Sequence, residues 1–261
     1  MFPTDGKKYK EKQVKKSLKQ NIDNFANVGN LLIENFIKQK NIDALKLIIY
    51  LAKLNTEFNN VIEIMEDENE IVTFEVPIDE ICLFYKIEKS SFRGKIKKIR
   101  STDFNYYDKI DEEEVFTTIF PEIRIKKDIV KIKMFKTLFK ELKKNLQNIK
   151  EQGYTQIKFL DRLMKLKKFN AYRMFIFLNR IRDFKYQNKT FCLEEFNGYF
   201  EVNYKELKEI RKNILKPLEE DLKGTIPFSY EEVFDESTKI GRKPIVGYKI
   251  YYKESTQLEN N

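Results

Sequence analysis

The feature that most constrains the fold of this chain is an order of short segments that occurs twice. Thr73-Phe74 opens the first copy and Thr190-Phe191 opens the second. In each copy an acidic pair follows, then an aromatic pair (Phe84-Tyr85, Tyr199-Phe200), then a segment rich in Lys and Arg. A repeated order of this kind indicates a duplicated structural unit.

The first copy is expected to form helices followed by a hairpin. Leu45, Ile48, Ile49 and Ala52 recur at helical spacing, which predicts one or two helices after Asn24. Segment 73–101 has the pattern of a short strand, a short helix, a turn and a basic helix, with Ser90 or Ser91 as the N-cap. EVFTTIFPEIRI and DIVKIKMF then alternate apolar and polar residues around Lys126-Lys127-Asp128, which predicts a two-stranded hairpin.

The second copy repeats this order. A helix is expected over 169–184, a short acidic helix at Glu194-Glu195-Phe196, and a basic helix in YKELKEIRKNILKPL. IPFSYEEVF and IVGYKIYY then predict a hairpin closed through residues 239–243. Helices followed by a hairpin are the element order of a winged helix-turn-helix domain.

We therefore expect an α+β, mainly helical fold with two tandem winged helix-turn-helix domains. The first is expected over 24–136, serving dimerisation or DNA contact, and the second over 137–253, as the main DNA reader. A basic N-terminal tail (1–23) and a C-terminal tail (254–261) flank them, and residues 135–153 are expected to form a Lys-rich helical bridge.

The charge balance suggests an anionic partner. Fifty Lys and Arg face 41 Asp and Glu, which gives a net charge of +9 and a pI near 9.2. Nucleic acid or an anionic membrane surface would fit this charge. The alternative is a solvated basic surface, so the distribution of the cations has to decide.

The composition excludes several kinds of chemistry. The chain has no His, which rules out Ser-His-Asp and Cys-His nucleophile systems and His-ligated zinc. Its 2 Cys lie far apart, and its 8 Gly form no phosphate-binding loop. With no apolar run of 18 residues, no membrane association is expected. We expect a cytoplasmic protein that has no enzymatic activity and no cofactor or metal.

The basic segment of the second copy is the strongest candidate for DNA contact. Asn203 and Glu206 have capping-box spacing, which places its start near 203. On a helix, Leu207, Ile210, Ile214 and Leu218 form one apolar stripe. Cations lie on the opposite face and flank: Lys205, Lys208, Arg211, Lys212 and Lys216. A solvated face is the alternative, but the third helix of a winged helix is the one that enters the major groove.

Two further groups of cations complete the candidate interface. The basic helix of the first copy carries Arg93, Lys95, Lys97, Lys98 and Arg100. Gly94 lowers its helix propensity by about 1 kcal/mol, unless the position needs a close backbone approach. Arg242 and Lys243 are expected at the tip of the second hairpin, within reach of phosphates or a minor groove, although an ordinary solvated turn remains the alternative.

Three strings between Phe169 and Tyr252 resemble one family. AYRMFIFL, EIRKNILKPLEEDL and KIGRKPIVGYKI are similar to a helix, a Lys/Arg-rich helix and a Gly-Arg-Lys hairpin of the theta-type replication initiators of iteron plasmids, the RepA/RepE initiator family. The resemblance implies a plasmid initiator that binds direct repeats in double-stranded DNA at the origin and promotes its opening. It also implies recruitment of the host initiator and helicase, a homodimer in equilibrium with monomer, and repression of the initiator's own gene.

Two other functions are alternatives. A winged-helix transcriptional regulator without an origin function would need the same DNA-binding residues. Direct repeats about two helical turns long beside the gene, next to an AT-rich tract, would favour the initiator. A nickase or primase is disfavoured by the missing His and by the lack of an acidic metal cluster in the sequence.

Overall fold

The computed structural model describes residues 25–57, 71–108, 113–142, 153–182, 185–237 and 243–252. Both predicted tails and most of the predicted bridge lie outside the described residues. The elements of the first half are β1 (Ala26–Gly29), α2 (Asn30–Lys38), α3 (Ile42–Glu57), β2 (Ile71–Pro77), α4 (Ile78–Tyr85), α5 (Lys89–Arg100), β3 (Asp103–Asp108), β4 (Glu113–Thr118), β5 (Glu122–Lys126), β6 (Ile129–Phe135) and α6 (Lys136–Phe139).

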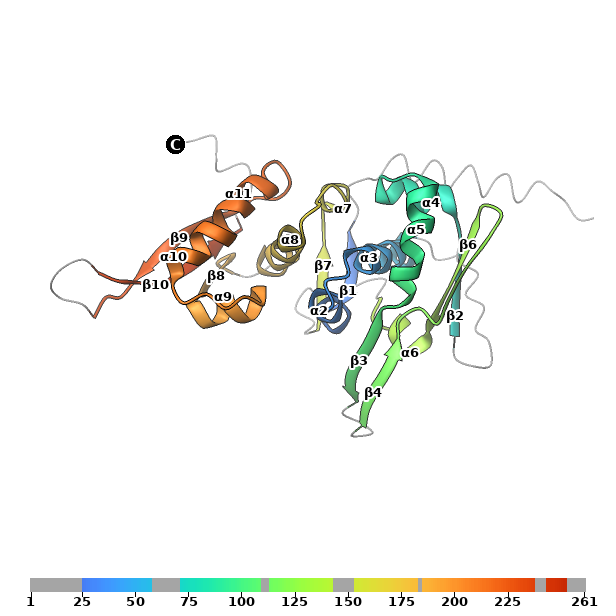
Figure 1. The fold of residues 1–261 in the computed structure, drawn as a ribbon, viewed down its shortest axis with the longest axis horizontal. Helices are drawn as coiled ribbons and strands as arrows, with labels where there is room; N and C mark the ends of the chain where they lie inside the picture. Colours follow the sequence, from blue (N-terminus) through green and yellow to red (C-terminus); the bar gives the residue numbers. More distant parts are fainter. Residues whose placement is uncertain are drawn as a thin grey trace, which may run out of the picture.

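The second half begins with a short strand and contains the second copy of the repeat (Figure 1). Its elements are β7 (Tyr154–Ile157), α7 (Leu160–Leu163), α8 (Phe169–Arg182), β8 (Asn188–Phe191), α9 (Leu193–Phe200), α10 (Leu207–Ile210), the π-helical turn η1 (Arg211–Leu215), α11 (Lys216–Leu222), β9 (Ser229–Phe234) and β10 (Ile245–Tyr251).

The duplication is visible in the two three-stranded sheets. Their strand orders are β2-β6-β5 and β8-β10-β9, so in each copy the first strand pairs with the last strand of the hairpin. Thr73 lies opposite Lys133 in one sheet, and Thr190 lies opposite Lys249 in the other. The expected α+β fold with two tandem winged-helix units is confirmed.

The short helix after the first strand of each copy explains the repeated acidic pair and aromatic pair. The acidic pair lies in the first turn of both α4 and α9, where carboxylates favour the positive end of the helix dipole. Both helices are eight residues long, and both end in a left-handed residue, Lys86 (φ 55°) and Glu201 (φ 53°). The aromatic pair precedes this residue in each copy and supplies buried side chains, among them Tyr85 and Phe200.

Alternation places one face of the β2-β6-β5 sheet in the core. Val72, Phe74 and Val76 of β2 are buried, and the residues between them are half-buried or exposed. Their cross-strand partners Met134, Ile132 and Val130 are also buried. This period-2 pattern fixes the register, because a shift of one residue would turn every apolar side chain to solvent.

Helix α8 lies between α11 and β7, and β7 pairs with β1 of the first half (Figure 1). The helix is buried on nearly all sides, including Arg173, whose side chain is 0% exposed. The Nη2 of Arg173 donates to the Ile37 carbonyl (3.3 Å) at the end of α2 and to Oε1 of Glu201 (2.9 Å) after α9. This one side chain therefore joins the first winged helix to the second.

Three boundaries differ from those expected from sequence. EVFTTIFPEIRI is not one strand: β4 pairs with β3 and only β5 pairs with β6. The break falls at Phe120 and Pro121, where a buried aromatic residue is followed by one that has no N–H to donate. Helix α5 begins at Lys89 with Glu88 as its N-cap, because the Glu88 carbonyl accepts from Phe92 N–H. The third difference is the start of the second basic helix, described below.

Strand β7 pairs antiparallel with β1, so the chain returns to the first half after the bridge. The Oγ1 of Thr155 also donates to Oδ1 of Asn30 (2.6 Å), across 125 residues of sequence. The domain boundary expected at residue 136 stays a prediction.

Candidate nucleic-acid interface

The second basic helix is a continuous helical segment over α10, η1 and α11. Ile210, Ile214 and Leu218 of the predicted stripe are buried, and Leu207 is half-buried. Lys208, Arg211, Lys212 and Lys216 are exposed. The segment therefore packs with one side and presents cations to solvent with the other. It also buries Leu215, which the regular helical spacing did not include.

The start of this helix lies three residues later than expected. Glu206, with an extended backbone (φ −140°, ψ 145°), is the N-cap, and Glu209 completes the capping box. The Oε2 of Glu209 accepts from the backbone N–H of Lys205 (3.0 Å) and of Glu206 (3.2 Å). The expected cap at Asn203 is therefore wrong, because the three-residue spacing recurs at 206 and 209. Lys205 is exposed and precedes the helix instead of belonging to it.

The cations of this helix differ in how they are held. Lys208 pairs with Glu206, and this contact raises the pKa of Lys208. Arg211 Nη1 lies 2.8 Å from Oε1 of Glu232 on β9, and hydrogen bonding to Tyr230 together with the charge of Glu232 raises the pKa of Arg211. Lys212 and Lys216 have no ion-pair partner within the described residues. They are the free cations of this surface.

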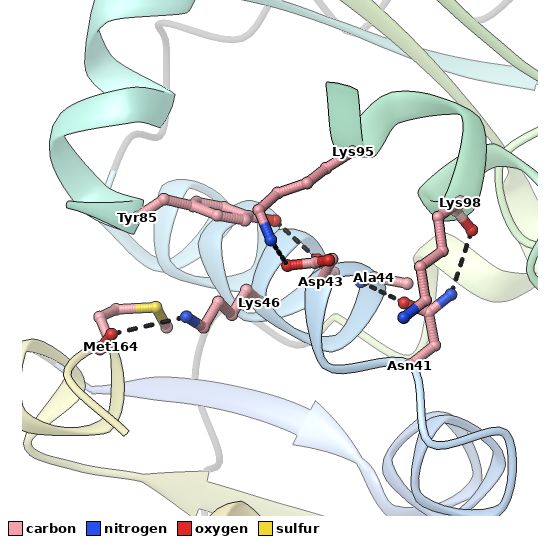
Figure 2. Close-up of polar contacts among 8 residues, drawn as sticks. All are labelled: Asn41, Asp43, Ala44, Lys46, Tyr85, Lys95, Lys98 and Met164. Carbon is pink, nitrogen blue, oxygen red and sulfur yellow. Dashed lines mark hydrogen bonds and ion pairs between the residues drawn. The ribbon is translucent and has the colours of Figure 1, made fainter. Parts of the chain in front are cut away.

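The first basic helix, α5, directs most of its cations to solvent. Arg93, Lys97, Lys98 and Arg100 are exposed, whereas Lys95 is half-buried. The Nζ of Lys95 lies 2.8 Å from Oδ1 of Asp43 on α3 (Figure 2). The predicted role of Lys95 in DNA contact therefore competes with a structural tie inside the first unit.

Asn41 provides a second tie between α3 and α5. Its Nδ2 donates to the Lys98 carbonyl (3.1 Å), and its Oδ1 accepts from Ala44 N–H (Figure 2). The same Nδ2 also donates to Oγ1 of Thr102 (2.7 Å). These bonds fix the orientation of α5 on the body of the unit. A Cβ at Gly94 would meet nothing within 4 Å, so packing inside the described chain does not require glycine there.

A hollow of about 810 Å³ opens between α5 and the connection from β4 to β5. Arg93, Lys97 and Arg100, spaced at i, i+4 and i+7, line its helical side. Phe120, Pro121 and Ile123 line the opposite side. Three of the five predicted cations of α5 are thereby brought to one groove.

The wing of the second unit is formed by β9 and β10. Lys243 is exposed just before β10, and the Pro244 carbonyl accepts from Asp235 N–H (3.0 Å) where the hairpin closes. Gly241 and the predicted site residue Arg242 lie outside the described residues. The exposed side chains of Phe234 and Val246 adjoin this end of the wing.

Lys46 connects the surroundings of α5 to the second half of the chain (Figure 2). Its Nζ lies 3.5 Å from the Met164 carbonyl and 5.4 Å from the ring centroid of Tyr172. Burial lowers the pKa of Lys46 to about 8, against the opposing effect of Asp43. Asp43 therefore pairs with Lys95 of α5 and also acts through its charge on Lys46, which contacts the second half of the chain.

Sequence reasoning missed three residues that order the candidate interface and the contact between the two units. Asp43 and Glu232 hold Lys95 and Arg211. Arg173 pairs with Glu201 and joins the two units. Arg173 alone left a signal, as a charged residue within the apolar string AYRMFIFL.

The described residues contain no group of three or more Cys, Asp or Glu placed to hold a metal ion. Nor do they contain a helix long and apolar enough to cross a membrane.

No protein-family model matches the chain, and no curated protein matches it in sequence. Matches to solved structures include domains 2 and 3 of RctB, at TM-scores of 0.42 (12% identity, 83% of each chain) and 0.44 (14% identity, 81% of each chain). The fold is similar to that of the Pi initiator protein, solved in complex with iteron DNA, with a TM-score of 0.65 and 12% identity over 90% of this chain and 99% of that chain. The resemblance to iteron-binding initiators is thus confirmed at the level of the fold, over nearly the whole length of both proteins.

Proposed function

We propose that this protein initiates replication by binding direct repeats in double-stranded DNA through both winged-helix units, without enzymatic activity of its own. The observation that carries the proposal is the placement of two exposed basic helices, α5 and α10-η1-α11, at equivalent positions of a duplicated fold. In a winged helix this is the helix that lies in the major groove. Similarity to a protein solved on iteron DNA supports the same reading.

The residues of the two units would make different contacts with DNA. The second basic helix combines free lysines with an arginine held in place by Glu232, a combination suited to base contact. Arg93, Lys97 and Arg100 of α5, and Lys243 of the wing, would neutralise phosphates. Two linked units lengthen the site that is read and raise the effective concentration of the second contact.

The remaining parts of the proposal have two sources. The division at residue 136 and a cytoplasmic location come from the element order and the composition of the sequence. Opening of an AT-rich tract, recruitment of the host initiator and helicase, and a monomer–dimer equilibrium with autorepression come from the family resemblance. A transcriptional regulator with the same fold would bind DNA without opening it.

The test combines binding with strand opening. Duplexes that carry the direct repeats beside the gene are compared with scrambled duplexes over a range of salt. We expect repeat-specific binding whose log K falls with log salt by about 0.9 per phosphate neutralised. Lys243→Ala should weaken both duplexes alike and reduce the slope by about one unit, while Lys167→Ala, at an exposed lysine before α8, is the matched control.

Affinity that does not change with salt, or that is equal for both duplexes, would contradict the proposal. Repeat-specific binding without permanganate-reactive bases in a supercoiled origin plasmid, even with the host initiator present, would favour the regulator instead.

A further inference from the structure

The second basic helix contains the π turn η1 at its centre. There the Lys216 N–H donates to the Arg211 carbonyl, five residues back instead of four. Pro217 explains this turn, because it has no N–H and its ring would clash with the carbonyl of Asn213 in a regular helix. Single π turns of this kind are frequent at functional sites.

The π turn changes which side chains share a face. Ile210 and Leu215, five residues apart, are both fully buried, and Leu218 and Leu222 continue that stripe at regular helical spacing. Of the four residues between Ile210 and Leu215, Arg211, Lys212 and Asn213 are exposed and Ile214 is buried. A π turn holds more residues than the 3.6 of an α-helical turn, so it rotates less per residue, and these three side chains leave the helix over a narrower arc.

The three side chains differ in what they can recognise. Arg pairs with guanine and Lys with guanine or phosphate, whereas Asn forms two hydrogen bonds to N6 and N7 of adenine. Arg211 is already held by Glu232. The side-chain amide of Asn213 has no partner among the described residues, so both its donor and its acceptor are open. Helix α5, KSSFRGKIKKIR, contains no Asn or Gln.

We propose that Asn213, presented by the π turn beside Arg211 and Lys212, is a specificity-determining residue that reads an adenine in the major groove. The proposal rests on the proposed function, because it assumes that this helix enters DNA. It places sequence discrimination in the second unit and gives it a defined chemical target.

The experiment is a selection from a randomised duplex library with the full-length protein. Wild type, Asn213→Ala and the control Asn203→Ala, which changes an exposed asparagine before the helix, are compared. We expect wild type and the control to enrich one motif, and Asn213→Ala to lose the preference for adenine at one position of it. At that position its affinity should fall roughly ten- to hundredfold.

Two further measurements separate base reading from a structural effect. Replacing that adenine with 7-deazaadenine, which lacks N7, should weaken wild type but leave Asn213→Ala nearly unchanged. The salt slope of Asn213→Ala should equal that of wild type, since a neutral side chain releases no counterion, whereas Lys212→Ala should lose about one unit.

The outcomes distinguish the two proposals. If wild type enriches no motif, the proposed function fails. The role of Asn213 is refuted, while DNA binding stands, if wild type enriches a motif and Asn213→Ala keeps the same adenine preference. It is also refuted if Asn213→Ala lowers the affinity for all sequences by the same factor.

Discussion

Replacing Arg173 with Met tests the contribution of a buried guanidinium to the joint between the two units. The change keeps a long, flexible side chain but removes the hydrogen bonds to Ile37 and Glu201. It also removes a cation from above the rings of Phe169 (4.8 Å) and Tyr199 (5.8 Å).

The magnitude follows from opposing contributions. Two hydrogen bonds made by a charged donor contribute about 1.5 to 3 kcal/mol each. Against this loss, Nε and Nη1 of Arg173 are buried without hydrogen-bond partners, and removing them recovers about 1 to 3 kcal/mol of desolvation cost. We therefore expect Arg173→Met to lower the free energy of unfolding by about 2 to 3 kcal/mol, or the melting temperature by about 4 to 12 °C.

Urea and thermal unfolding, followed by circular dichroism, measure this change. The control is Lys168→Met, because Lys168 is 66% exposed and its ion pair with Asp221 should contribute less than about 1 kcal/mol. Since Arg173 joins the units, the variant should also unfold in two separable transitions. Equal stabilities of the two variants, with a single transition in both, would refute the reasoning.

Three further changes test the surroundings of α5. Lys46→Met should stabilise the protein at pH 7, and this advantage should shrink towards pH 9.5, because native Lys46 loses its proton near pH 8 while the unfolded chain keeps it to about 10.5; urea titrations that give a pH-independent difference would contradict it. Asp43→Asn should free Lys95 and steepen the salt dependence of DNA binding by up to about one unit, and an unchanged slope would show that Lys95 does not contact phosphate. Gly94→Ala should raise stability by up to about 1 kcal/mol, and a simultaneous loss of DNA affinity would show that DNA approaches the backbone there.

The sequence predicted the parts of the fold that carry local periodicity. The alternation in β2 and β6, the apolar stripe of the second basic helix and the order of the repeated units all appear in the structure. Pairings between distant short segments left no such signal: β1 and β7 are four residues long and far apart in the chain. The hairpin of β3 and β4 was missed because β4 and β5 together read as one alternating run.

The cations of the candidate interface were also predictable only in part. Exposure of Lys208, Lys212 and Lys216 follows from helical periodicity. That Lys95 pairs with Asp43 and Arg211 with Glu232 depends on tertiary contacts, which charge patterns along one helix do not contain. The capping box failed at Asn203 for a local reason, since two candidate pairs share the same spacing.

The pairing of β1 with β7 has a consequence for the order in which the protein can fold during synthesis. The first winged helix is synthesised before residues 154–157. Strand β1 therefore has no partner strand when synthesis of the rest of this unit is complete. A fragment that ended at residue 136 would keep β1 without that partner, and an unpaired edge is a site for pairing between chains. A soluble first half should therefore extend through Ile157 and Lys158.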